Sequence, residues 1–366
     1  MIEFSCKHFG SCGGCFYDKI GSTPYKELKK QLVKKDLQSV FDSRIIDNVD
    51  FIWLDKYSRR KSTFHIDCNN KLGFFASRSK KIIKIDECLI CNKEILALKT
   101  KIEEFLKSLP AKLFTKAIIT NFDNGLDLVF KITQELTFSQ SQKLINFAKT
   151  QNINISYQIN DGDFLPIILN RSNQINIANY QLDLASNIFI QATKEGLTEI
   201  DKIIKEQIFS VSKSKNLKIA DIYTGFGAYS FTASNLAQNI TAFEGSLDMI
   251  KILKNNIAKH NLNHKIQAQN RDLFQSPITH KELNKFDLII INPPRNGATP
   301  QIKEIVKSNI KNIIYISCNP KTFAFDSKIL LDSGFKIKKL TILDQFIGSK
   351  HLEIVGVFSF KHIAKH

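Results

Sequence analysis

From about residue 181 to the end of the chain, short apolar runs alternate with segments in which apolar residues recur every three or four positions. The short runs predict buried strands and the longer segments predict amphipathic helices. The predicted strands are Leu217–Tyr223, Ile240–Phe243, Ile266–Gln269, Phe286–Ile291, Asn312–Ile316, Phe335–Leu343 and Glu353–Phe358, and the predicted helices are Ala228–Ala237, Ser246–His260, Ile302–Ser308 and Thr322–Leu331. This alternation predicts an α/β fold with a mostly parallel, doubly wound sheet. Because no helix separates the last two strands, we expect an antiparallel closing strand.

Two further regions precede this one. Between about residues 97 and 180 the patterns predict a small α+β domain, with helices at Lys101–Leu109 and Ser139–Lys149 and strands at Ala117–Thr120 and Leu126–Ile132. Residues 1–96 are basic and carry every cysteine except Cys318. We therefore expect three domains, covering 1–96, 97–180 and 181–366.

Charge points to a polyanionic partner. The formal net charge is +17 and the sequence pI is about 9.4, and basic residues cluster at Lys56–Lys61 and Arg78–Lys81. Nucleic acid is the simplest partner for such a chain, although a genome-wide bias toward lysine codons would also raise the pI. No apolar run has the length of a membrane span and no secretory signal is evident, so we expect a cytoplasmic protein that makes no membrane contact.

Candidate site residues fall at the ends of the predicted strands. In an open α/β sheet, ligands bind beyond the carboxyl ends of the parallel strands. Glu353 begins the closing strand, and an antiparallel strand starts at the same edge where its neighbours end. The residues that this places at one edge are Tyr223, Gly225, Glu244, Asp272, Asn292, Cys318 and Glu353.

Two loops at this edge suit a nucleoside-like ligand. Gly225 and Gly227 let backbone approach a ligand closely, and Glu244, about twenty residues further on, can accept bonds from ribose hydroxyls. The alternatives are a plain tight turn and a solvated carboxylate at a helix start. The two prolines in Asn292-Pro293-Pro294-Arg295 predict that the chain leaves the preceding strand in an extended conformation, which could form a rigid binding surface for a planar group. The alternative is a rigid loop without a ligand.

Cys318 lies between a predicted strand and a predicted helix. Asn319 can cap that helix and Pro320 suits its first position. A thiol near a helix N-terminus has a lowered pKa, which favours the reactive thiolate. The alternative is a buried structural cysteine, because free cysteine is often buried.

The whole set of motifs resembles a known family. The motifs are Phe189-Ile190-Gln191, Asp221–Gly227, Glu244, Asn292–Gly297, Ser317–Pro320 and Asp344-Gln345-Phe346 with His351-Leu352-Glu353. In this order, over essentially the whole chain, they resemble the S-adenosylmethionine-dependent RNA uracil-C5 methyltransferases. The resemblance implies a Rossmann-like methyltransferase domain. Asn292 stands where many members carry Asp, and Thr224 where many carry Cys.

The resemblance also implies a covalent mechanism. Cys318 would be the nucleophile that adds to uracil C6, and Glu353 the base that removes the C5 proton. The positions that match the family's S-adenosylmethionine site are Gln191, Tyr223, Glu244 and Asn292, and we add Gly225 and Asp272 from their places at the sheet edge.

The N-terminal cysteines predict a metal site. Cys6, Cys12 and Cys15, with Cys88 downstream, have the irregular spacing that suits a [4Fe–4S] cluster. Cys88 and Cys91 could instead supply the second pair of a zinc site. The family resemblance favours the cluster with Cys88 as fourth ligand and a structural role, which leaves Cys68 and Cys91 without a metal.

RNA contacts are expected near the catalytic edge. The stretch from Tyr57 to Phe64 resembles the family's substrate-side strand, so Arg59, Lys61 and Arg295 are candidate RNA contacts, although a solvated charged strand would look the same. We expect a flipped uridine in a single-stranded loop.

The branch of the family is a separate question. A cluster without an N-terminal β-barrel resembles the branch that acts on a hairpin loop of 23S ribosomal RNA, and we expect a monomer. The alternatives are a tRNA uridine-C5 methyltransferase, an amino-group nucleic-acid methyltransferase and a non-catalytic Fe–S RNA-binding protein.

Overall fold

The C-terminal half of the chain, with one strand from the N-terminal region, forms an eight-stranded sheet in the computed structural model, which describes residues 5–17, 21–160, 162–214 and 216–360. The strand order is β1-β16-β17-β15-β14-β11-β12-β13. Their bounds are β1 Asp50–Trp53, β11 Lys218–Ile222, β12 Asn239–Glu244, β13 Ile266–Asn270, β14 Leu288–Ile291, β15 Asn312–Ser317, β16 Phe335–Asp344 and β17 Glu353–Phe360. All are parallel except β17, which runs antiparallel to both β15 and β16. The predicted parallel sheet with an antiparallel closing strand is confirmed.

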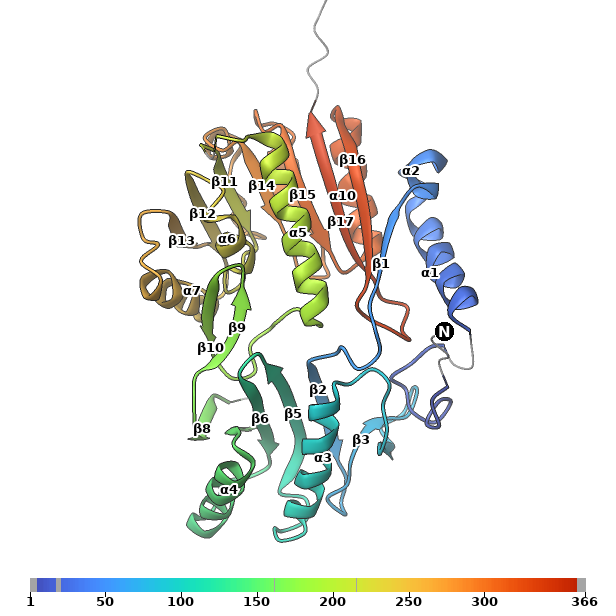
Figure 1. Cartoon of the computed structure of the whole chain (residues 1–366), viewed down its shortest axis with the longest axis vertical. Helices are drawn as coiled ribbons and strands as arrows, with labels where there is room; N and C mark the ends of the chain where they lie inside the picture. Colours follow the sequence, from blue (N-terminus) through green and yellow to red (C-terminus); the bar gives the residue numbers. More distant parts are fainter. Residues whose placement is uncertain (1–4, 18–20, 161, 215, 361–366) are drawn as a thin grey trace, which may run out of the picture.

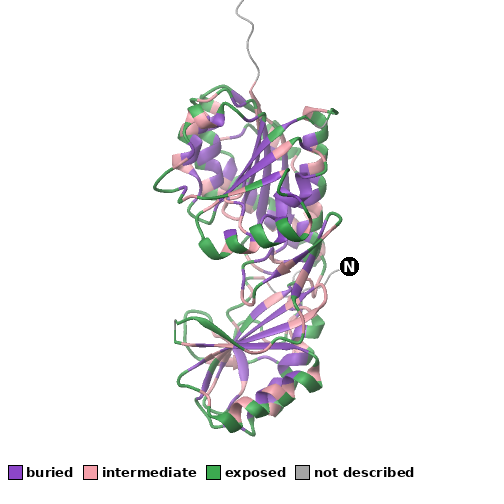
Figure 2. Ribbon diagram, turned by 90° about the vertical axis from the view of Figure 1, so that its left-hand side faces the viewer, coloured by how far each residue is buried: buried purple, intermediate pink, exposed green. Residues whose placement is uncertain are grey.

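Helices cover both faces of this sheet, as Figure 1 shows. One face packs against α5 (Lys194–Val211), α6 (Ala228–Ala233) and α7 (Leu247–Lys259), and the other against α1 (Ser22–Leu37), α2 (Ser43–Asp47), α8 (His280–Leu283), α9 (Thr299–Ile305) and α10 (Pro320–Asp332). Within β15, Ile314 and Ile316 point into the first core while Ile313 and Tyr315 point into the second. Strands buried on both faces read as continuous apolar runs, which explains the sequence pattern. Figure 2 shows these buried positions along the strands.

A second sheet of seven strands forms the other body of the molecule. Its order is β4-β3-β2-β5-β6-β7-β8, from β2 Lys61–Ile66, β3 Leu72–Phe75, β4 Ile82–Lys84, β5 Phe114–Phe122, β6 Gly125–Ile132, β7 Asn154–Ile159 and β8 Phe164–Ile168. The helices α3 (Lys93–Leu106) and α4 (Phe138–Gln151) pack on it, and Thr137 and Gln140 form a capping box at the start of α4. A separate hairpin, β9 (Asn173–Ile177) and β10 (Tyr180–Leu184), connects this body to the larger sheet.

The N-terminal region is shared between the two bodies. Strand β1 pairs with β16 and so extends the C-terminal sheet, whereas β2 pairs with β5 of the second sheet. The boundary predicted at residue 96 therefore does not coincide with a break between sheets. The hairpin β9–β10 likewise crosses the boundary predicted at residue 180.

Among the described residues, no helix combines the length and the apolar character that crossing a membrane requires.

Candidate active site and cysteine pocket

The larger sheet gathers the predicted site residues at one edge. Tyr223, Asn292 and Cys318 each follow directly on a parallel strand, and Glu244 is the last residue of β12. Ser317 of β15 lies opposite Ile354 of β17. In an antiparallel pair this register places the next residue of one strand beside the preceding residue of the other. Cys318 and Glu353 are therefore neighbours across two adjacent strands.

The turn after β11 is built around a buried carboxyl group. Asp221 is fully buried and accepts hydrogen bonds from the hydroxyls of Thr224 (2.5 Å) and Ser230 (2.6 Å). Burial raises its pKa to about 6. Gly227 has a φ of +93°, and a Cβ there would come within 2.4 Å of Leu253. The turn thus needs glycine for its backbone conformation and for its packing.

Glu244 organises the same turn from the neighbouring strand. One of its carboxylate oxygens accepts from the amide of Gly225 (2.9 Å) and the other from the amide of Ser246 (2.9 Å). Gly225 has a φ of +58° and open space where a Cβ would stand. Each carboxylate oxygen retains a second lone pair, which leaves Glu244 able to accept from a ligand hydroxyl.

The other predicted ligand-binding residues differ in how many of their polar atoms already have a partner. Gln191 is buried, and its amide nitrogen has no partner among the described residues. The Tyr223 hydroxyl also lacks one, and its ring lies 5.5 Å from that of Phe274. The Asp272 carboxylate is already held by the amides of Phe274 and Gln275. Buried donors without a partner are rare in folded proteins, so Gln191 has the geometry of a residue that meets a ligand.

The loop after β14 is fixed to the sheet and to helix α10. The amide of Asn292 donates to the carbonyl of Ile222 (3.1 Å). Asp326 of α10 accepts from the amide of Ala298 (2.8 Å), from the hydroxyl of Thr299 (2.5 Å) and from the hydroxyl of Tyr315 (2.6 Å). These bonds hold the segment between residues 292 and 299 rigidly beside the start of α10.

Cys318 precedes α10 as expected, and the Asn319 side chain caps the helix by accepting from the amide of Lys321. The predicted lowering of its pKa is wrong: burial and the nearby Glu353 carboxylate raise the pKa of the Cys318 thiol. The charge of Arg295, and a hydrogen bond from its side chain to the sulfur, act in the opposite direction. The Arg295 carbonyl is held by the Asn319 side chain (2.9 Å). Arg295 thus takes the stabilising role that the sequence suggested for the helix terminus.

Glu353 lies in a nearly dry environment. Only 4 % of it is exposed, and the side-chain amide of Gln345 donates a hydrogen bond to its carboxylate at 2.7 Å. Burial raises the pKa of Glu353 to about 8, against the lowering effect of that bond. A carboxylate with a pKa this close to neutrality suits a general base.

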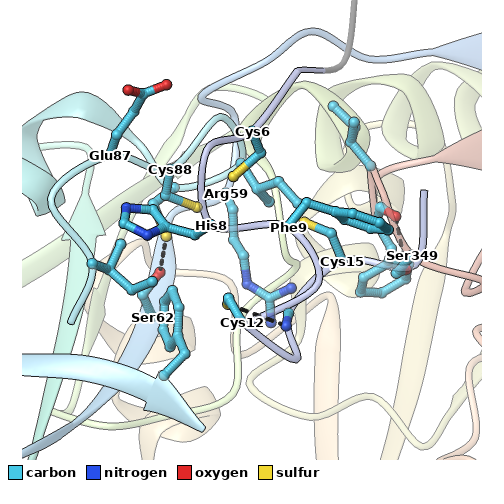
Figure 3. A pocket seen from close by; sticks show the side chains of 17 residues that line it. Cys6, His8, Phe9, Cys12, Cys15, Arg59, Ser62, Glu87, Cys88 and Ser349 are labelled. Carbon is cyan, nitrogen blue, oxygen red and sulfur yellow. Dashed lines mark hydrogen bonds between the residues drawn. The ribbon is translucent and has the colours of Figure 1, made fainter. Parts of the chain in front are cut away.

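The N-terminal cysteines line a separate cavity of about 280 Å³. Figure 3 shows Cys6, Cys12, Cys15 and Cys88 around it, together with Arg59. Phe346, Ile347 and Ser349, from the loop between β16 and β17, form another part of its wall. Within the described ranges, no three His, Cys, Asp or Glu side chains are arranged to hold a metal ion.

The two remaining N-terminal cysteines differ. Cys68 is exposed, whereas Cys91 is buried at the cavity wall and lies 3.1 Å from the Ser62 hydroxyl. A hydrogen bond from the Cys91 thiol, together with the amides of Cys91 and Ile90, lowers the pKa of Cys88 to about 6. This environment favours a Cys88 thiolate, the form that binds metal.

The predicted RNA contacts at the start of β2 face different surroundings. Arg59 lines the cysteine cavity, and its Nε donates to the carbonyl of Lys61 (3.1 Å). The Lys61 ammonium donates to the carbonyls of Asn187 (3.0 Å) and Ile188 (2.9 Å), and burial lowers its pKa to about 8. Lys61 therefore joins β2 to the segment that leads to Gln191, and its contact with RNA stays a prediction.

Sequence reasoning missed a buried charged cluster beside the site. Lys29 of α1 is fully buried and pairs with Asp344 at 2.8 Å, and Tyr25 donates to the other oxygen of Asp344 at 2.6 Å. The signal was present in the sequence, because Lys29 is spaced four residues from Tyr25 and from Val33, both of which are buried. A lysine in the middle of an apolar helix stripe is unusual and indicates a buried partner.

Comparison with known proteins gives one consistent family. The family model described as tRNA (Uracil-5-)-methyltransferase matches residues 30–362. An uncharacterized RNA methyltransferase of Caulobacter vibrioides is 30% identical over 97% of this chain and 85% of its own length. The 23S rRNA (uracil(1939)-C(5))-methyltransferase RlmD of Shewanella sp. is 27% identical over 96% of this chain and 81% of its own length.

A solved structure shares the fold. The Pyrococcus abyssi tRNA (uracil-54, C5)-methyltransferase, determined in complex with S-adenosyl-L-homocysteine, superimposes with a TM-score of 0.74 and 19% identity, over 95% of this chain and 86% of that one. With a family model that matches nearly the whole length, the chain belongs to the tRNA (uracil-5-)-methyltransferase family of RNA uracil-C5 methyltransferases.

Proposed function

We propose that this chain methylates C5 of a uridine in 23S ribosomal RNA, with S-adenosylmethionine as the methyl donor and Cys318 as the covalent nucleophile. The observation that carries the proposal is the pairing of Cys318 with Glu353 across β15 and β17, next to Arg295. A thiol and a buried base at one ligand-binding edge supply both groups that the reaction needs. The ribosomal substrate is supported by the names of the Shewanella relatives.

The residues at the sheet edge fit the methyl donor. Gln191 and Tyr223 offer buried polar groups without partners, Gly225 offers open backbone, and Glu244 retains acceptor capacity for a ribose. Asp272, two residues after β13, and Asn292, directly after β14, complete the set. When bound there, S-adenosylmethionine supplies an electrophilic methyl group.

Cys318, Arg295 and Glu353 act at different steps of the proposed reaction. Uracil C5 is a poor nucleophile until the Cys318 thiolate adds to C6, which moves the C5–C6 electron pair toward the C4 carbonyl oxygen and leaves an enolate. Arg295 favours the thiolate by its charge and its hydrogen bond. After C5 is methylated, Glu353 removes the C5 proton, the electrons re-form the C5–C6 double bond, and the C6–sulfur bond breaks.

The cysteine cavity suits a [4Fe–4S] cluster held by Cys6, Cys12, Cys15 and Cys88. In support, these four thiols line one cavity, and hydrogen bonds lower the pKa of Cys88. Each thiolate in such a cluster binds a different iron atom, so the sulfurs need not converge on one point. Iron and sulfide analysis after anaerobic purification tests this assignment, and zinc without sulfide would refute it.

Arg59 and Arg295 are the proposed RNA contacts, because one lies at the cysteine cavity and the other at the nucleophile. A tRNA substrate is the second candidate, and the name of the matching family model favours it. Mass mapping of 5-methyluridine in 23S ribosomal RNA and in tRNA, from cells with and without this protein, separates the two. The Cys318→Ala variant should abolish the difference. No change in either RNA would refute the proposed function.

A further inference from the structure

We propose that Lys29 is a positioning residue for the catalytic base, because its ammonium joins both ends of the loop that leads to Glu353. This inference rests on the proposed function, in which Glu353 removes the C5 proton. The loop runs from residue 345 to residue 352, between β16 and β17. Lys29 comes from α1, at the other end of the sequence.

The contacts of Lys29 close the loop. Its Nζ donates to the carboxylate of Asp344 at 2.8 Å and to the backbone carbonyl of His351 at 3.0 Å. Asp344 is the last residue of β16, and His351 stands two residues before Glu353. One buried ammonium therefore fixes the separation between the start and the end of the loop.

Tyr25 holds the middle of the same loop. Its hydroxyl donates to Asp344 at 2.6 Å and accepts from the amide of Gly348 at 3.1 Å. The Gly348 carbonyl accepts in turn from the amides of Phe16 (2.6 Å) and Tyr17 (3.2 Å). Gly348 has a φ of +74°, and a Cβ there would approach Cys15 and Ile90, so the loop is pressed closely against the cysteine segment.

Inside the loop, Gln345 makes the contact that reaches Glu353. Its amide donates to the Glu353 carboxylate at 2.7 Å, and it follows directly after Asp344. The chain of contacts is thus continuous from Lys29 through Asp344 and Gln345 to the base. All four side chains are at least 96 % buried, so their positions depend on one another.

A buried ammonium is not needed for stability alone. Desolvation of an ion pair often costs as much as its attraction returns, and well-packed apolar residues are frequently as stable. What the charged pair adds here is a fixed geometry, because Lys29 binds two acceptors that belong to the two ends of one loop. A base displaced by about 1 Å loses roughly a hundredfold in rate, so such a restraint matters for the proton transfer.

The inference predicts which step fails. Loss of the Lys29 contacts leaves Cys318 in place, since it is held by β15 and α10. Addition to C6 should then proceed, while removal of the C5 proton slows. The methylated RNA should accumulate as a covalent adduct with the protein instead of being released.

The test compares Lys29→Met with Lys99→Met. Lys99 is a similarly buried lysine that pairs with Glu103 at 2.9 Å in α3, which packs on the seven-stranded sheet, so it matches the cost of removing a buried charge. The probes are 23S ribosomal RNA transcribed in vitro and unmodified tRNA, each with S-adenosylmethionine. With Lys29→Met, we expect denaturation-stable RNA–protein adduct to rise about tenfold and turnover to fall about tenfold. Lys99→Met should show neither effect.

Two further measurements keep the inference decidable. If Lys29→Met does not fold, the double variant Lys29→Met with Asp344→Asn removes the buried charge on both sides. Hydrogen exchange of the amides between residues 345 and 353 should accelerate in these variants but not in Lys99→Met, whether or not the RNA is a substrate. A folded variant with wild-type exchange in this loop, or with normal turnover and no adduct, overturns the inference. Methylation by Cys318→Ser would instead refute the proposed function and leave the loop measurement to decide on Lys29.

Discussion

Replacing Glu353 by Gln should stabilise the fold while it blocks product release. Burial raises the pKa of this carboxyl group from 4.5 to about 8. The folded chain therefore keeps a proton that the unfolded chain releases above pH 4.5. For a group of this kind, stability falls as pH rises through the window between the two pKa values and is constant above it. Glutamine is neutral throughout and can still accept the bond from Gln345.

The size of the effect follows from the width of this window. Each pH unit corresponds to about 1.4 kcal/mol, so wild type should lose about 3 kcal/mol relative to Glu353→Gln by pH 7, and nearly 5 kcal/mol above pH 8. The two proteins should be equally stable near pH 4.5. Burial of the Glu353 carboxylate therefore lowers the free energy of unfolding at neutral and higher pH.

Urea unfolding between about pH 5 and pH 9 measures the difference. The one tryptophan of the chain, Trp53, lies in β1 opposite Asp344 and reports on the sheet that contains Glu353. The exposed Glu135→Gln serves as a control and should show no such pH dependence. A stability difference that stays constant with pH would refute the reasoning, as would a wild type that gains on the variant as pH rises.

Three further predictions concern residues around the site. Arg295→Ala should raise the pKa of Cys318 further, so alkylation of this thiol should need a higher pH than in wild type. Replacement of the exposed Arg44 by Ala is the control and should leave the pH profile of alkylation unchanged. An unchanged profile in Arg295→Ala would contradict the role of Arg295. Asp326→Ala removes two hydrogen bonds to the segment around residues 292–299 and one to Tyr315, and should weaken S-adenosylmethionine binding about tenfold by calorimetry, an expectation that fails if affinity is unchanged. Lys61→Met should lower the urea midpoint, because two partly buried carbonyls lose their donor, and equal midpoints would argue against its internal role.

The sequence predicted the catalytic sheet well because its strands are buried on both faces. Apolar runs such as Phe286–Ile291 are visible without knowledge of their partners, and the edge rule then places Asn292 and Cys318 together. Strand β1 was not predicted, because its short, half-exposed run Asp50–Trp53 becomes a strand only through pairing with β16.

The electrostatics of the site were less accessible to sequence reasoning. The helix that follows Cys318 was correctly expected, but the pKa of the thiol depends on burial and on Glu353 and Arg295, which lie on other elements. The Lys61 contacts likewise depend on a segment more than a hundred residues away. Local sequence specifies which residues can be charged, whereas their partners are set by the folded chain.

The ion pair between Lys29 and Asp344 has a consequence for biosynthesis. Its two residues are 315 positions apart, so helix α1 leaves the ribosome long before its partner has been translated. During that interval a lysine in an apolar helix stripe has no acceptor, and β1 has no strand to pair with. Contacts of such long sequence separation form late and slowly. A chain that stops before residue 335 would lack both the ion pair and the strand that β1 joins, so this part of the sheet can close and order the base only after β16 and β17 have been synthesised.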